Sequence, residues 1–85
     1  ECLDMVFFDA NHTKEATLNY FNQCLAKANN NTVFIFDDIY WSEGMTQAWE
    51  EIYKNPAVTY SIDLFHLGIV FFNKEWKKSH FKIKF

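Results

Sequence analysis

The sequence is poor in glycine, with Gly44 and Gly68 as its only two in 85 residues. Loops that cradle nucleotide phosphates need several glycines within a few positions. The chain therefore contains neither a dinucleotide-binding fingerprint nor a P-loop. Cysteine is also scarce, and Cys2 and Cys24 form no C-x-x-C pair. This spacing disfavours a zinc site, a redox pair or a disulfide scaffold and indicates reduced thiols in the cytoplasm.

Long apolar runs and positive charge are missing as well. No stretch is long enough to span a bilayer, and we expect no signal peptide. Eight basic residues face 11 acidic ones, which gives a formal net charge of −3. Nucleic-acid binding needs a clustered positive surface. We therefore expect a cytoplasmic protein that binds neither nucleic acid nor membrane.

Aromatic residues, by contrast, are abundant: ten Phe, three Trp and four Tyr make up 20% of the chain. Such a composition excludes a disordered segment. A chain of this size buries only about 60–65% of its unfolded surface, so it needs a rich core. We expect residues 1–85 to form a single domain.

Two apolar runs, Leu3–Phe8 and Val33–Phe36, predict strands buried on both faces, as in a parallel sheet covered by helices. Thr13 is a suitable N-cap for a helix between them. That helix carries an apolar stripe from Leu18 to Ala28. Together these elements predict a right-handed βαβ unit.

The second half of the chain predicts a helix capped by Ser42 and two further strands. Alternation from Val58 to Leu64 predicts a half-buried strand with its polar residues outward, and Leu67–Phe72 predicts another. Their short link predicts an antiparallel hairpin. The tail 80–85 alternates too, as an edge strand does. The expected order is β-α-β-α-β-β in a mixed α/β fold.

Carboxylates follow both of the first two predicted strands, as Asp9 and as the pair Asp37 and Asp38. The carboxyl ends of parallel strands lie at one edge of a sheet, where ligands bind. Three oxygen ligands suit Mg²⁺, Ca²⁺ or Mn²⁺. The alternative is that each Asp satisfies local backbone groups.

The loops at that edge supply further candidates. His12 follows Asp9, and its ordinary pKa of about 6.5 suits a proton acceptor, although a solvated loop histidine is the alternative. Asn11 either binds a ligand or stabilises the turn. Tyr40 and Trp41 either wall a substrate site or pack against the second helix.

Two other polar groups are expected on the surface. His66 lies in the hairpin link and His80 in the tail. Lys74, Lys77 and Lys78 form a small basic cluster, which we interpret as a solvated face.

The segments FFDANH and VFIFDDIYWSEGM, followed by a hairpin ending in GIVFFNKE, resemble the carboxyl-terminal half of a class I S-adenosylmethionine-dependent methyltransferase, of the bacterial O-methyltransferase kind. The resemblance implies the fourth to seventh strands of a Rossmann-like, seven-stranded sheet. It also implies S-adenosylmethionine as the methyl donor and a small-molecule acceptor.

Similarity to the cation-dependent catechol and caffeoyl enzymes implies roles for individual residues. Asp9 falls on a position that binds the metal, and we assign it to the cofactor and catalytic sites as well. Asp37 and Asp38 complete the metal site, with Asp38 in place of that family's Asn. His12 replaces a lysine as the base. These two departures leave the metal dependence and the identity of the base open. Many relatives in the broader group use no metal.

In this fold the first three strands, with a glycine-rich loop, hold the donor. The resemblance therefore implies a fragment that lacks the cofactor-binding amino-terminal half and is inactive alone. Its first strand would be an edge for self-association. Whether oxygen, nitrogen or carbon is methylated stays open. The competing class is a non-enzymatic, receiver-like α/β interaction domain with an acidic metal site.

Overall fold

The computed structural model describes residues 4–8 and 13–83, which form a mixed α/β fold with five strands and two helices. The predicted fold class is thus confirmed. In chain order the elements are β1 (Asp4–Phe8), α1 (Lys14–Leu25), β2 (Thr32–Asp37), α2 (Glu43–Lys54), β3 (Tyr60–Asp63), β4 (Leu67–Phe71) and β5 (Ser79–Lys82).

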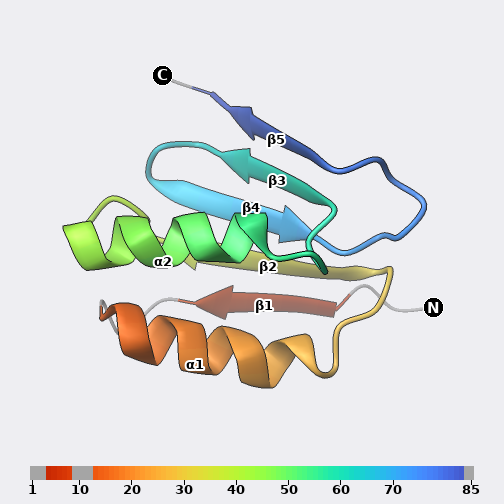
Figure 1. Cartoon of the computed structure of the whole chain (residues 1–85), viewed down its shortest axis with the longest axis horizontal. Helices are drawn as coiled ribbons and strands as arrows, with labels where there is room; N and C mark the ends of the chain where they lie inside the picture. Colours follow the sequence, from red (N-terminus) through yellow and green to blue (C-terminus); the bar gives the residue numbers. More distant parts are fainter. Residues whose placement is uncertain (1–3, 9–12, 84–85) are drawn as a thin grey trace.

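The five strands form one sheet in the order β1-β2-β4-β3-β5 (Figure 1). β1 and β2 are parallel, and β4 lies antiparallel between β2 and β3. β3 therefore runs in the same direction as β1 and β2. The tail forms β5, which pairs in parallel with β3. The sequence had predicted a terminal hairpin followed by a tail that alternates as an edge strand does, and in the structure β5 follows the β3–β4 hairpin as that strand.

Both helices pack on the same face of the sheet, and both lie in front of it in Figure 1. Phe21 of α1 meets Phe34 and Phe36 of β2, with ring centroids 5.9 and 6.1 Å apart. Trp49 of α2 meets the same Phe36 at 6.1 Å. One aromatic layer therefore joins all three elements. The buried cluster around it consists of Phe8, Phe21, Phe34, Phe36, Ile39, Trp49, Ile52, Val58, Val70 and Phe72.

The opposite face of the sheet is open over the part of the chain that the structure describes. Met5 and Phe7 of β1 are 61% and 55% exposed. The prediction that the first strands are buried on both faces is therefore wrong for these residues, because both helices cover the other face. Trp76, from the link before β5, partly covers the open face by packing on Tyr60 and Phe71, with centroids 5.7 and 5.6 Å apart.

The predicted N-caps begin both helices. The Thr13 and Ser42 hydroxyls each accept a hydrogen bond of 3.2 Å from the backbone N–H three residues further on. This satisfies a donor that the first helical turn leaves unpaired. α1 ends at Leu25, before the predicted end of its stripe at Ala28. In residues 4–8 and 13–83, neither helix has the length and apolar character needed to cross a membrane.

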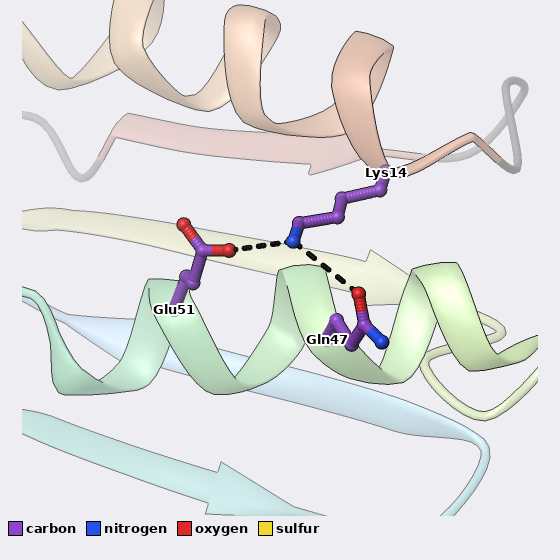
Figure 2. Close-up of polar contacts among 3 residues, drawn as sticks. All are labelled: Lys14, Gln47 and Glu51. Atoms are coloured by element: carbon purple, nitrogen blue, oxygen red, sulfur yellow. Dashed lines mark hydrogen bonds and ion pairs between the residues drawn. The ribbon is translucent and has the colours of Figure 1, made fainter.

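A surface contact joins the start of α1 to the side of α2 that faces it (Figure 2). The Lys14 ammonium lies 2.9 Å from a Glu51 carboxylate oxygen and donates to the side-chain oxygen of Gln47 at 3.3 Å. The Lys14 and Glu51 side chains are both exposed, so this pair contributes little to stability.

The end of α2 is held by Lys78, which the sequence had placed in a solvated basic cluster. Its ammonium donates to the backbone carbonyls of Tyr53, Asn55 and Val58 at 3.2, 3.1 and 2.7 Å. The last carbonyls of a helix lack intrahelical partners and carry partial negative charge. Lys78 therefore caps α2 from a link 20 or more positions further along the chain.

Candidate active site

The carboxyl ends of β1, β2 and β3 lie along one edge of the sheet, on the left in Figure 1. Phe8 pairs with Phe36, so β1 and β2 end side by side. Asp63, the last residue of β3, pairs with Gly68, which pairs in turn with Phe36. The edge therefore gathers Asp37 from β2 and Asp63 from β3. It is the edge where ligands of open α/β sheets bind.

Three of the predicted site residues, Asp9, Asn11 and His12, lie outside the described residues. Their assignments to the metal, the cofactor, the acceptor and the proton transfer stay predictions.

Asp37 and Asp38 form a tight local turn at the end of β2. The Asp38 N–H donates to its neighbour's carboxylate at 3.0 Å and to the carbonyl of His66 at 2.9 Å. Asp38 adopts a left-handed backbone with φ 56°, which Asp tolerates better than most residues. The Asp37 carboxylate thus makes the local bond that the alternative interpretation expected.

The described residues give the predicted divalent cation no support. Among residues 4–8 and 13–83, no group of three or more His, Cys, Asp and Glu side chains is placed to hold a metal ion. Asp37 and Asp38 form only part of the predicted ligand set. The described residues therefore assign no role in the chemistry to a divalent cation.

Tyr40 and Trp41, which follow this turn in the chain, have different surroundings. The Tyr40 hydroxyl donates to the Asp63 carboxylate, and its ring stacks on Phe65 with centroids 5.5 Å apart. Burial, together with Asp63, raises the pKa of Tyr40, so its hydroxyl stays protonated as a donor. Trp41 is 65% exposed at the same edge. Of the two residues, Trp41 is the more exposed.

Asp63 is the residue at this edge whose importance the sequence did not reveal. It is only 1% exposed, yet its carboxylate accepts bonds from Tyr40, from Trp49 Nε1 at 3.2 Å and from the backbone N–H of Phe65 at 2.8 Å. Buried carboxylates are costly unless hydrogen-bonded. These three donors therefore fix the loop after β2, helix α2 and the β3–β4 turn around one group.

The predicted orientation of β3 is wrong. Alternation had placed its polar residues on the solvent side, but Ser61 and Asp63 are 1% exposed and face α2. They are buried because hydrogen-bonding partners meet them there. A signal for Asp63 was available, since it ends a strand parallel to β1 and β2 and so follows the same rule as Asp37.

His80 extends this buried polar group toward β5. Its Nδ1 lies 2.6 Å from the Ser61 hydroxyl, and its ring stacks on Tyr53 at 3.8 Å. Burial lowers the pKa of His80, against the opposing effect of Asp63. His80 is exposed, as predicted, and these contacts also attach β5 to the domain. Ser61 is too buried to act as a nucleophile.

The described residues offer no glycine-rich loop for S-adenosylmethionine. A Cβ on Gly68 would lie 2.5 Å from ring carbons of Trp49, so that glycine accommodates an indole. Gly44 lies in the first turn of α2, next to Lys14. Neither glycine therefore cradles a ligand.

Residues 1–39 match the family model of a methyltransferase domain. The match spans β1, α1 and β2, so this part of the chain is similar to a methyltransferase domain. No curated protein and no solved structure matches the chain significantly. The receiver-like alternative is not favoured, because its sheet would be parallel where β4 is antiparallel.

Proposed function

We propose that this chain is the acceptor-side half of an S-adenosylmethionine-dependent methyltransferase that methylates a hydroxyl oxygen of a small molecule. The observation that carries the proposal is the methyltransferase-domain match across β1, α1 and β2. In the structure these elements form a parallel β-α-β unit whose strands end at the edge holding Asp37, Asp38 and Trp41.

In this proposal His12 accepts the proton of the acceptor hydroxyl, since a base with a pKa near neutrality is suited to that task. Asp9 and Asp37 orient the acceptor, and Asn11 and Trp41 contact its body. Tyr40 stays protonated and bonded to Asp63, which supports Trp41 in place. The donor, when bound, supplies an electrophilic methyl group. The protein holds the two reactants in line.

We further propose that the partner of this chain is the amino-terminal half of the same domain. Met5 and Phe7 expose large apolar side chains on the open face of β1. Among the described strands, β1 pairs only with β2. An unpaired strand edge beside exposed apolar side chains favours association, either with the missing half or with a second copy.

The test compares the 85-residue chain with the longer protein that its reading frame encodes. We expect the chain alone to bind no S-adenosylmethionine by calorimetry and to transfer no labelled methyl group. We expect the longer protein to methylate members of a panel of small hydroxyl compounds. His12→Ala should lower kcat by about 10²–10⁴-fold, as for loss of a general base. Glu43→Gln, on the exposed first turn of α2, is the matched control.

Each result bears on one part of the proposal. Micromolar binding of the donor by the 85-residue chain would refute the half-domain proposal. Methylation of amines but not of hydroxyls by the longer protein would refute oxygen as the acceptor atom. Assays with added Mg²⁺ and with a chelator measure any dependence on a cation.

A further inference from the structure

A cavity of about 570 Å³ lies at the end of the molecule opposite the candidate active site. Its walls come from the ends of α1 and α2 and from the end of β4, all on the right in Figure 1. The apolar residues of the lining include Leu25, Ala28, Ala57 and Phe72. Small-molecule sites in proteins have this size and this mostly apolar lining.

The polar groups of the cavity differ in how they are used. Thr59 donates its hydroxyl to the carbonyl of Phe71 at 3.3 Å, so that group is already paired. Lys74 is exposed at the cavity, where its backbone N–H donates to the side chain of Asn30 at 3.1 Å. This bond holds Lys74 at the rim and leaves its ammonium on a flexible stem.

The charge of the lining differs from that of the chain as a whole. Of the eight residues that line the cavity, all within the described part of the chain, Lys74 alone is charged. The complete chain carries a formal net charge of −3. Lys78, which caps α2 nearby, offsets the partial negative charge of that helix end. The cavity therefore offers an anion a cationic partner without an opposing acid in the lining.

We propose that this cavity is a binding site for a small molecule with an apolar or aromatic body and a carboxylate group. The body occupies the space between Ala28, Ala57 and Phe72, and the carboxylate pairs with the Lys74 ammonium. This site is separate from the proposed acceptor site, since it lies at the opposite edge of the sheet.

The test uses the 85-residue chain and three matched probes: 4-phenylbutanoate, 4-phenylbutan-1-ol and 4-phenylbutylammonium. Backbone amide shifts are followed by NMR during titration. With about twelve non-hydrogen atoms at ordinary ligand efficiency, the carboxylate should bind with a Kd in the millimolar range. Saturable shifts are expected at Ala28, Ala57 and Thr59. The alcohol should bind at least about fivefold more weakly, and the ammonium more weakly still.

Two variants separate the site from general adhesion. Lys74→Gln removes the charge from an exposed side chain and should weaken carboxylate binding to the level of the alcohol. Lys77→Gln removes an exposed charge in the same link that does not line the cavity, so binding should not change. Equal binding of all three probes, equal effects of the two variants, or shifts that do not saturate would each overturn the proposal.

Discussion

The indole ring of Trp49 lies directly over Gly68, so close that a Cβ on this glycine would be 2.5 Å from the ring carbons. Gly68 pairs across the strands with Asp63, and the same indole donates to Asp63 through Nε1. A single side chain of α2 therefore fills the space above β4 and supports the buried carboxylate of β3. The absence of a side chain at Gly68 is what permits both contacts.

Substitution of Gly68 by Ala should destabilise the fold. The added methyl group must displace a buried ring, and overpacking of this kind costs about 1–3 kcal/mol. Urea unfolding should report the loss as a lower midpoint. Gly44→Ala is the control, because its Cβ would lie at an ordinary 3.6 Å from the Lys14 Cβ. That helical substitution should be neutral or stabilise by up to about 1 kcal/mol.

Removal of the Tyr40 hydroxyl should reveal the contribution of its bond to Asp63. Tyr40→Phe leaves the carboxylate with two donors, from Trp49 and Phe65, and should cost about 1–3 kcal/mol in the free energy of unfolding. Tyr20→Phe, at a half-exposed ring on α1, is the matched control and should change little. A double-mutant cycle with Asp63→Asn then measures the coupling. Additive effects of the two substitutions would contradict the hydrogen bond.

The sequence predicted the parts of the fold that depend on local pattern. Both N-caps and the strand class of β1 and β2 follow from spacing and residue type. Thr13 and Ser42 cap because their hydroxyls bond within the same turn. Nothing distant is needed to make those contacts.

The parts of the fold that the sequence did not predict depend on partners far away along the chain. Asp63 is buried because Tyr40 and Trp49, 23 and 14 positions away, point donors at it. Lys78 stays exposed, yet its ammonium reaches carbonyls of the last turn of α2, of the C-cap Asn55 and of the loop after it. From residue type alone, polar and charged residues are expected on the surface. Only the tertiary structure shows which of them have buried partners.

Substitution of Lys78 by Met should weaken the end of α2. The change keeps the apolar stem but removes a charged donor shared by three carbonyls, which should cost about 1–3 kcal/mol. Hydrogen exchange should show faster opening of the last turn of α2. Lys77→Met, one position earlier and exposed, should leave both the unfolding midpoint and the exchange rates unchanged. Equal effects of the two substitutions would refute the capping role.

Acid should loosen β5 through His80. Burial holds the pKa of His80 below its ordinary value of 6.5, although Asp63 opposes the effect and Lys78 and Lys82 reinforce it. Because the folded pKa is the lower one, the stabilisation is complete above about pH 6.5. It is lost as the pH falls toward the folded pKa.

The measurement is the urea midpoint at pH 7.5, 6.5 and 5.5, for the native chain and for His80→Phe. The variant keeps a ring to stack on Tyr53 but has no titratable group at this position. The native midpoint should therefore decline more steeply than that of the variant as the pH is lowered. Parallel curves would show that His80 does not titrate in this way.

The position of β4 has a consequence for how the chain folds. β4 follows five other elements in sequence but lies in the middle of the sheet, between β2 and β3. β3 and β4 are joined by a short turn, so their hairpin can form within microseconds, whereas docking onto β2 requires closure of a much longer loop. The slow step should therefore be the insertion of a preformed hairpin. A chain still emerging from the ribosome cannot complete its sheet until β4 has left the exit tunnel.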